Sequence, residues 1–413
     1  MKRSGTGSTI GRREFLKRGV MAGVGVSLIP LGASADASID TTPQVRRYSM
    51  LGRTGMKISD ISFGASRLTS GQEDLIRHAF DLGINYFDTA ESYTDGESET
   101  VIGNALKGKR DKVFLTSKTI AQPDDKSDAM MRALEGSLRR LQTDHVDVYF
   151  NHAVNNVERL KNPEWYKFVE QARTQGKLRF AGMSGHAGNL AQCLDYAIDG
   201  GHVDVILCAH NFGQDPRFYQ RFFRRFDFVA VQPDLPRIMQ KAKQHGVGVV
   251  CMKTLMGARL NDMRKYESGG ATFSQAAFRW VLSNQNVDAL IVSMTSREMI
   301  DEYLGASGAR ASAERDLQIL NRYASLNGKS YCRHGCNQCE DACPYGVPIS
   351  EVMRTRMYAH DYGDQRMARS EYAMLAGSAA ACLSCDAKPC AGACPHGIAT
   401  DVLLGPAHQL LTA

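Results

Sequence analysis

The sequence predicts an α/β protein with a (β/α)8 (TIM) barrel followed by a small cysteine-rich domain. Two observations support this fold class. Eight apolar, β-branched runs alternate with helical segments from residue 58 onward, and eight of the 11 cysteines fall between Cys332 and Cys394. Strands buried on both faces with helices between them indicate a parallel sheet, and eight repeats over about 240 residues suit a closed barrel.

Length and charge restrict the classes of function. The chain has 413 residues, enough for a large core plus an appendage, and its formal net charge is +6. Residues 1–19 hold six basic residues against one acidic residue, a sum of +5, so the rest of the chain is near +1. Without a basic stripe, the sequence predicts no nucleic-acid partner.

The first 35 residues are predicted to be a twin-arginine signal peptide. The motif consists of Arg12, Arg13, Phe15, Leu16 and Lys17. The uncharged run 20–33 is broken by Pro30 and is shorter than the roughly 20 residues of a stable membrane helix, so no permanent span is expected. The small-residue pattern at 33–35 predicts cleavage after Ala35. We expect export through the twin-arginine translocase, periplasmic in the simplest case; an ordinary secretory signal is the alternative.

The barrel prediction follows the chain from residue 46. The segment 46–59, with Gly52 and Gly55 at its turn, predicts a short hairpin that could close the lower end of the barrel. The eight strand candidates are ISDISFGA, INYFDTA, KVFLTSKT, VDVYFNHA, LRFAGMSG, VDVILCAHN, GVGVVCMKT and DALIVSMT. Between them, segments such as 128–142 have helical spacing of their apolar residues. An open doubly wound sheet is the alternative, but the first strand lacks the G-x-G-x-x-G pattern after it.

Three consecutive predicted strands end in a charged or imidazole side chain, namely Asp88, Lys118 and His152. In a barrel of this kind, polar groups at the carboxyl ends of strands usually carry the chemistry. Tyr93 follows Asp88 by five residues, and we expect Lys118 to lower the pKa of its phenol. A tyrosine tuned in this way can pass a proton to a carbonyl oxygen as a hydride reaches the carbon, with His152 orienting that oxygen. Separate, satisfied polar groups are the alternative.

These motifs resemble the aldo-keto reductase superfamily over residues 46–305. The matching stretches are LGRTGMKIS, FDTAESYTDGESETVIGNAL, VFLTSK, DVYFNHA and NVDALIVSMTS. The resemblance implies a (β/α)8 barrel that binds an extended nicotinamide cofactor. It also implies Tyr93 as the general acid, with Asp88, Lys118 and His152 completing the tetrad. We interpret Gly96, Ser98, Glu99 and Gly103, which also match, as helix-start and packing residues.

The resemblance also implies an NAD or NADP site, although the match is less complete there. The implied cofactor-binding residues are Gly64, Ser184, Asn211, Lys253, Leu255, Gly257, Ser293, Arg297 and Glu302. Gly185, Leu207 and His210 stand where members of the family often have asparagine, glutamine and an aromatic residue. The choice between NAD and NADP stays open.

The cysteines form two runs, C-x3-C-x2-C-x3-C-P and C-x2-C-x4-C-x3-C-P. Eight thiolates in runs that end in Cys-Pro indicate two [4Fe–4S] clusters in a ferredoxin-like iron–sulfur domain. In that pattern the fourth cysteine of each run ligates the other cluster. One cluster would use Cys332, Cys336, Cys339 and Cys394, and the other Cys382, Cys385, Cys390 and Cys343. Two all-thiolate zinc sites and four disulfides are the alternatives.

The predicted domains are the signal peptide 1–35, the barrel 46–305, a capping helix and linker 306–330, and the ferredoxin-like domain 331–413. The helical segment 350–378 between the cysteine runs could pack near the mouth of the barrel. Cys193, Cys208 and Cys251 are predicted to be core residues.

Two functions from different classes follow. The first is an exported, nicotinamide-dependent oxidoreductase that acts on a carbonyl or alcohol, sugar-like substrates included. Its clusters would serve electron transfer with a partner protein, or structure, because hydride carries two electrons and each cluster takes one. The second is a non-catalytic electron-transfer or interaction subunit with a degenerate barrel site.

Overall fold

The structure of the chain is a computed structural model that describes residues 42–413 with several short gaps. The gaps are 187–188, 215–233, 256–262, 265–266, 268–269, 310, 328–331, 333–336 and 361–363. The predicted signal peptide over residues 1–35, Gly257 and Cys336 therefore lie outside the described residues. Within the part of the chain that the structure describes, no helix is both long and apolar enough to cross a membrane.

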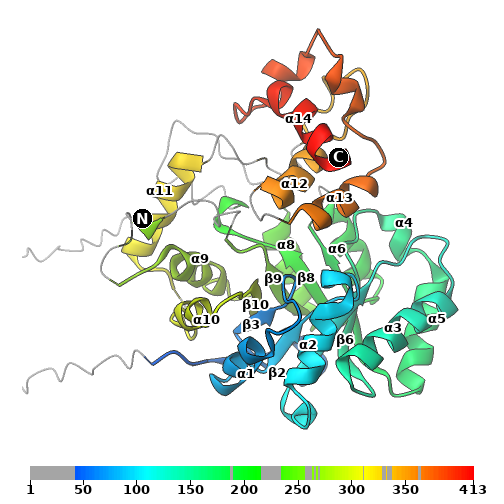
Figure 1. Cartoon of the computed structure of the whole chain (residues 1–413), viewed down its shortest axis with the longest axis vertical. Coiled ribbons are helices and arrows are strands. Elements are labelled where there is room, and N and C mark those ends of the chain that lie inside the picture. The colour runs from blue at the N-terminus through cyan, green and yellow to red at the C-terminus, as the bar shows by residue number, and fades with distance from the viewer. Residues whose placement is uncertain are drawn as a thin grey trace, which may run out of the picture. The chain divides into compact units, whose positions relative to one another are not determined.

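Eight parallel strands close into a barrel in the order β10-β3-β4-β5-β6-β7-β8-β9 (Figure 1). The strands are β3 (Ile61–Gly64), β4 (Tyr86–Asp88), β5 (Phe114–Thr119), β6 (Val146–Asn151), β7 (Leu178–Gly185), β8 (Val205–Ala209), β9 (Gly248–Met252) and β10 (Ala289–Ser293). Each apolar run of the sequence supplies one strand, so the predicted (β/α)8 barrel is confirmed. Because the strands are parallel, all their carboxyl ends open at the same end of the barrel.

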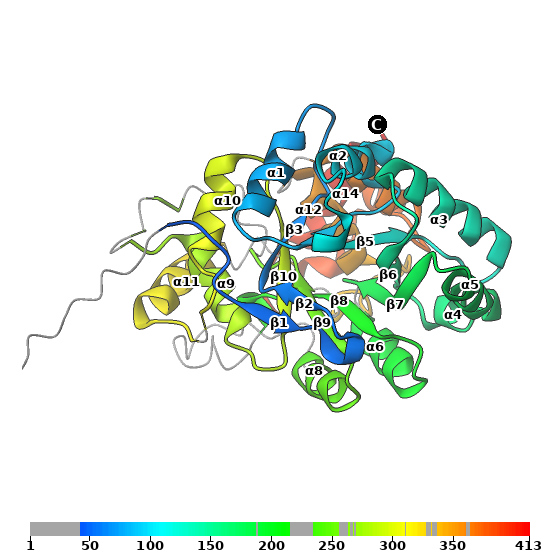
Figure 2. The same ribbon diagram turned by 90° about the horizontal axis from the view of Figure 1, so that it is seen from below.

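An antiparallel hairpin closes the opposite, lower end of the barrel (Figure 2). It consists of β1 (Tyr48–Met50), the 3₁₀ turn η1 (Gly52–Thr54) and β2 (Lys57–Ser59). Leu51, Met56 and Ile58 are fully buried and pack against the inward-facing side chains of the strands. Gly52 has a φ of 49°, and a Cβ there would lie 2.3 Å from the backbone nitrogen of Gly248. The predicted hairpin is confirmed, and its turn requires glycine.

Helices surround the strands, and most of the core lies between the two layers. The helices are α1 (Glu73–Asp81), α2 (Glu97–Ala105), α3 (Ser127–Leu141), α4 (Val157–Leu160), α5 (Pro163–Thr174), α6 (Leu190–Asp199), α8 (Leu235–Gln244), α9 (Phe273–Leu282) and α10 (Arg297–Leu304). Shorter 3₁₀ turns are η2 (Tyr93–Gly96), η3 (Arg110–Lys112) and η4 (Phe212–Gln214). In α3, Leu134, Leu138 and Leu141 are buried in this core, as their helical spacing predicts. Cys193, Cys208 and Cys251 are fully buried core residues, also as predicted.

Helix α2 packs closely on α3, and this contact accounts for four residues that match the family pattern. A Cβ at Gly103 would lie 2.6 Å from the backbone oxygen of Arg140. Gly96 has a φ of 85° at the start of α2. Ser98 donates to a backbone carbonyl of the barrel, and buried Glu99 accepts from Arg140 at 2.7 Å. Their predicted roles in packing and in starting the helix are confirmed.

The remaining described residues form one helix beside α9 and a group of helices above the barrel mouth (Figure 1). Helix α11 (Glu314–Asn327) packs on α9, where Arg279 forms an ion pair with buried Asp316 at 2.9 Å. A second core then joins α12 (Ile349–His360), α13 (Gln365–Ala373), α14 (Thr400–Thr412), and the 3₁₀ turns η7 (Ala380–Leu383) and η8 (Pro389–Gly392). We call residues 332–413 the cysteine-rich module. The helix predicted over 350–378 is therefore two helices, α12 and α13.

Candidate active site

The four predicted catalytic side chains meet at the open end of the barrel. Asp88 ends β4, Lys118 lies near the end of β5, His152 directly follows β6, and Tyr93 begins η2 above β4. Lys118 Nζ lies 2.7 Å from Asp88 Oδ1 and 3.4 Å from the Tyr93 hydroxyl. The Tyr93 ring stands edge-on to the His152 imidazole, with ring centroids 5.6 Å apart. The structure thus brings together the whole set that the sequence predicts.

Asp88 and Lys118 form a buried ion pair beneath Tyr93. Their side chains are 1% and 0% exposed. Burial raises the pKa of Asp88 and lowers that of Lys118, and the charge of each partner opposes the shift of the other. Lys118 also donates to the backbone carbonyl of Thr89 at 2.5 Å. The ammonium group is therefore fixed in position, 4.7 Å from the centre of the Tyr93 ring.

The prediction that Lys118 lowers the pKa of Tyr93 is wrong. Burial raises the pKa of Tyr93 well above its ordinary value, and the carboxylates of Asp88 and Glu371 raise it further. The free-energy cost of desolvating a Tyr93 phenolate exceeds its electrostatic attraction to Lys118, because the charge of Lys118 is already matched by Asp88. Tyr93 is therefore a neutral phenol at physiological pH, the form that can donate a proton.

His152 is also neutral at physiological pH. Burial lowers its pKa well below the ordinary value, and the nearby cations Lys118, Arg159 and Lys253 lower it further. Its Nδ1 is buried and makes no hydrogen bond within the described residues. A neutral imidazole can donate from one nitrogen and accept at the other, so it can orient an oxygen atom without adding charge to the site.

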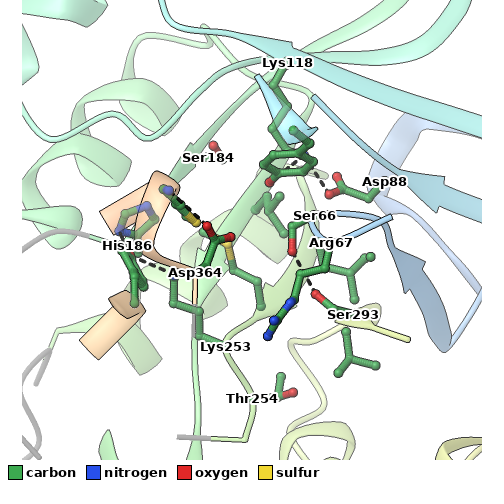
Figure 3. A pocket seen from close by; sticks show the side chains of 18 of the residues that line it. Ser66, Arg67, Asp88, Lys118, Ser184, His186, Lys253, Thr254, Ser293 and Asp364 are labelled. Atoms are coloured by element: carbon green, nitrogen blue, oxygen red, sulfur yellow. Dashed lines mark hydrogen bonds and ion pairs between the residues drawn. The ribbon is translucent and has the colours of Figure 1, made fainter. Parts of the chain in front are cut away.

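The four side chains line a cavity of about 910 Å³ at the barrel mouth (Figure 3). Its polar wall includes Ser66, Arg67, Ser184, Thr254 and Ser293, and its apolar wall includes Leu207, Met252, Leu255, Ile291 and Val292. A concave, largely apolar cavity with a few converging polar groups is typical of a small-molecule site. Titratable groups with strongly shifted pKa values in such a cavity indicate catalysis.

The comparisons with known proteins agree with this geometry. A family model described as the aldo/keto reductase family matches residues 60–269, about half of the chain, and the match includes all four catalytic candidates. The chain belongs to the aldo/keto reductase family. It is therefore an NAD(P)-dependent oxidoreductase, and the predicted resemblance is confirmed for the barrel.

Individual relatives support the same assignment. A methylglyoxal reductase of Escherichia coli is 39% identical over 267 residues, which cover 62% of this chain and 85% of the relative. An L-galactose dehydrogenase of Arabidopsis thaliana is 25% identical over 312 residues, which cover 67% of this chain and 92% of the relative. Among solved structures, an aldo-keto reductase of Bacillus halodurans has a TM-score of 0.52 at 20% identity, covering 67% of this chain and 95% of that chain. This last likeness shows the fold alone.

The reductase places several predicted cofactor residues on the cavity wall. These residues are Gly64, Ser184, Lys253, Leu255 and Ser293. Ser184 Oγ accepts a hydrogen bond from the backbone of Ala153 at 2.9 Å, and the hydroxyls of Ser293 and Ser66 lie 2.9 Å apart. The side chains at this end of the barrel are therefore held in fixed orientations.

Three other predicted cofactor residues do not line the cavity. Asn211 donates to the backbone carbonyl of Lys253 at 3.2 Å, so it holds the loop that follows β9. Arg297 forms an ion pair with Asp74 at 3.2 Å. The backbone carbonyl of Glu302 accepts from the side chain of Gln275 at 2.8 Å. Direct contacts of these three residues with a cofactor stay predictions.

The cavity offers polar atoms to a bound molecule. The Thr254 hydroxyl is buried on the cavity wall and, like His152 Nδ1, makes no hydrogen bond within the described residues. A buried polar atom without a partner costs free energy, about 1–3 kcal/mol, unless a ligand or water completes its bonding. The donor and acceptor set of the reductase therefore fits a polar ligand such as a nicotinamide nucleotide.

Three side chains of the cysteine-rich module complete the cavity of the reductase. They are Tyr358 on α12, Asp364 at the start of α13, and Met367 on α13. The sequence predicts helices here and suggests that they pack near the barrel mouth, but it does not single out these side chains. A single helical segment does not reveal which of its faces meets a second domain. We call α12 and α13 the roof of the site.

A buried polar network joins the roof to the barrel. The Tyr358 hydroxyl accepts from Lys253 Nζ at 2.8 Å and from Arg354 at 3.0 Å, and lies 3.1 Å from His186 Nδ1. Arg354 also pairs with Glu371 at 2.7 Å and approaches His186 Nδ1 at 3.3 Å. Both neighbours are placed to donate to Nδ1, so the neutral form of His186 is assigned the tautomer with its proton on Nε2, which lies 3.8 Å from Glu371.

Four cysteines of the module line a second, smaller cavity of about 370 Å³, and none of them forms a disulfide. They are Cys343, Cys382, Cys385 and Cys390. Burial raises the pKa of Cys382, and the other three sulfurs raise it further, which shows that the four groups are close neighbours. Among the described residues, no group of three or more histidine, cysteine or acidic side chains is arranged to hold a metal ion.

Proposed function

We propose that the chain is an exported aldo-keto reductase that transfers hydride between a nicotinamide cofactor and a carbonyl or alcohol substrate, sugar-like substrates included. The observation that carries the proposal is the contact of Tyr93 with the buried Lys118–Asp88 pair inside the barrel cavity. The desolvation cost of burying this charged pair beside a neutral phenol is explained by catalysis and has no evident role in a non-catalytic subunit.

Each catalytic side chain then has a distinct role. Tyr93 donates its phenolic proton to the carbonyl oxygen in reduction and takes a proton from the alcohol in oxidation. Lys118, held by Asp88, stabilises the phenolate that remains after the proton has left. His152 orients the reacting oxygen. The bound nicotinamide supplies or accepts the hydride.

The residues that would hold the cofactor are the cavity-lining set Gly64, Ser184, Lys253, Leu255 and Ser293. The buried hydroxyl of Thr254 adds a hydrogen-bonding group that the sequence does not predict. Arg297 and Glu302 on α10 would contact the adenosine end, and Gly257 would lie in the loop after β9. Contacts with the adenosine end of the cofactor would determine the choice between NAD and NADP.

The direct test is a titration of the purified protein with NADH and NADPH, followed by cofactor fluorescence. Turnover is then measured with methylglyoxal and with a panel of aldoses. We expect saturable binding of at least one cofactor and turnover of at least one substrate. Folded protein that binds neither cofactor would exclude the enzyme and favour the non-catalytic subunit.

We further propose that the cysteine-rich module holds two [4Fe–4S] clusters. The four cysteines around the second cavity are the set that the crossed ferredoxin pattern assigns to one cluster, with three from one run and Cys343 from the other. A four-iron cube carries its ligands at separate corners, so its thiolates surround a space, whereas the ligands of a single ion converge on one point. Cys332, Cys336, Cys339 and Cys394 would hold the other cluster.

Removal of one cluster ligand tests this assignment. We expect Cys385→Ala to lose iron and about half of the visible absorbance of anaerobically purified protein, because it empties one of two sites. Cys193→Ala, which removes a buried cysteine of the barrel, should keep the full iron content. Equal iron in the two variants, or wild-type protein that contains zinc in place of iron, would refute the cluster proposal.

Export through the twin-arginine route is the remaining part of the proposal. The support is the motif around Arg12 and Arg13 and the small residues up to Ala35. Clusters and nicotinamide are loaded in the cytoplasm, so a protein that carries them outward must fold first. We expect the Arg12→Lys, Arg13→Lys double variant to accumulate in the cytoplasm with its iron bound. Normal export of this variant, measured by cell fractionation, would show that the leader is of another type.

A further inference from the structure

The cysteine-rich module contributes a carboxylate to the cavity of the barrel. Asp364 lies on the cavity wall at the start of α13 and is half-buried. In the view of Figure 3, its carboxylate lies between His186 on one side and Ser66 and Arg67 on the other. The catalytic steps of the proposed function do not use this group.

Two hydrogen bonds fix the position of Asp364. Its side chain accepts from the backbone N–H of Met367 at 3.0 Å, which caps the N-terminus of α13. Its own backbone N–H donates to the carbonyl of Tyr358 at 2.9 Å. Since Tyr358 is held by Lys253 and His186 of the barrel, the network also positions Asp364 relative to the cavity. The cap uses one acceptor site of a carboxylate that has about four.

We propose that Asp364 determines substrate specificity by accepting hydrogen bonds from hydroxyl groups of a polyhydroxylated, sugar-like substrate. The inference rests on the proposed function and narrows its substrate class. A ligand that covers the half-buried carboxylate removes water from it, and this costs free energy unless the ligand supplies hydrogen-bond donors. A plain aldehyde supplies none. Vicinal hydroxyls of a sugar supply such donors. The hydroxyl of Ser66 on the same cavity wall suits the same ligand.

The same group disfavours another ligand type. A small apolar carbonyl compound would displace water from Asp364 and would not replace the hydrogen bonds that the water donates to the carboxylate. Sites that are built to bind a substrate hydroxyl discriminate strongly against analogues that lack it, because the polar group of the site is then left unpaired.

The test is Asp364→Asn in the full chain, since asparagine caps a helix as well as aspartate does and keeps the start of α13. The kcat and KM are measured for the best aldose of a panel that includes L-galactose, D-galactose and D-glucose, and for methylglyoxal. We expect the aldose KM to rise roughly 10- to 100-fold, the range for hydrogen bonds to a charged group. The change for methylglyoxal should be much smaller. Asp128→Asn, an exposed aspartate on α3, is the matched control.

Each other outcome has a defined meaning. Equal losses for the aldose and methylglyoxal would assign Asp364 a structural role and overturn the inference. An unchanged aldose KM, or turnover of methylglyoxal and of no aldose, would overturn it as well. These results leave the proposed function intact, whereas a protein that binds no NADH or NADPH and turns over nothing would refute both.

Discussion

Replacement of Tyr93 by phenylalanine is expected to lower kcat by about 10²- to 10⁴-fold, the usual contribution of a positioned general acid. The variant keeps the aromatic ring, whose centroid lies 5.6 Å from that of the His152 imidazole. It loses the hydroxyl that lies 3.4 Å from Lys118 Nζ. Because the pKa of Tyr93 is raised, the wild-type phenol is fully protonated near pH 7 and available as a donor. The binding of NADH or NADPH should stay within a few-fold of wild type, since the hydroxyl serves proton transfer.

The measurement is steady-state turnover of one substrate, with the cofactor titration on the same samples. Tyr196→Phe is a matched control, because Tyr196 is half-buried on the outer helix α6, away from the cavity, and its loss of a hydroxyl should leave kcat unchanged. A Tyr93→Phe variant with wild-type kcat would refute the assignment of Tyr93 as the general acid. A variant that loses cofactor binding to the same extent would indicate a role in binding.

The barrel and the catalytic set are predictable from the sequence for a simple physical reason. Strands buried on both faces must be apolar along their length, so a charged residue at the end of such a run stands out. Asp88, Lys118 and His152 all occupy that position on neighbouring strands, and parallel strands bring their ends together. The clustering of these side chains therefore follows from the local apolar pattern of each strand and from the parallel arrangement of neighbouring strands.

The roof is not predictable in the same way. Its contacts join residues far apart in the chain: the sequence separation is 105 for Lys253 and Tyr358 and 172 for His186 and Tyr358. Helix α12 carries buried polar side chains, Arg354 among them, so its sequence does not show a clean apolar face. The raised pKa of Tyr93 is not predictable from the sequence for a related reason. The depth of burial of Tyr93 and the effect of Glu371 on its pKa both depend on the roof.

Replacement of Arg354 by methionine is expected to cost about 3–5 kcal/mol in the free energy of unfolding, the range for removing one partner of a buried ion pair. Arg354 is 2% exposed and pairs with Glu371 at 2.7 Å and with Glu351 at 2.8 Å. Burial alone would lower its pKa, but Tyr358 and the two carboxylates raise it well above the ordinary value. Without the guanidinium, Glu371 is left buried beside His186, and α12 and α13 lose the ion pair that joins them.

The measurement is chemical denaturation followed by circular dichroism, together with kcat/KM for the best substrate. Arg369→Met, on the exposed side of α13, is the matched control and should change stability by less than about 0.5 kcal/mol. The double variant Arg354→Met, Glu371→Met should recover much of the loss, because it removes the more buried of the two carboxylates that lose their partner and leaves only the more exposed Glu351 unpaired. If the double variant is less stable than Arg354→Met alone, the network acts through packing. If Arg354→Met is as stable as wild type, the roof does not depend on this ion pair.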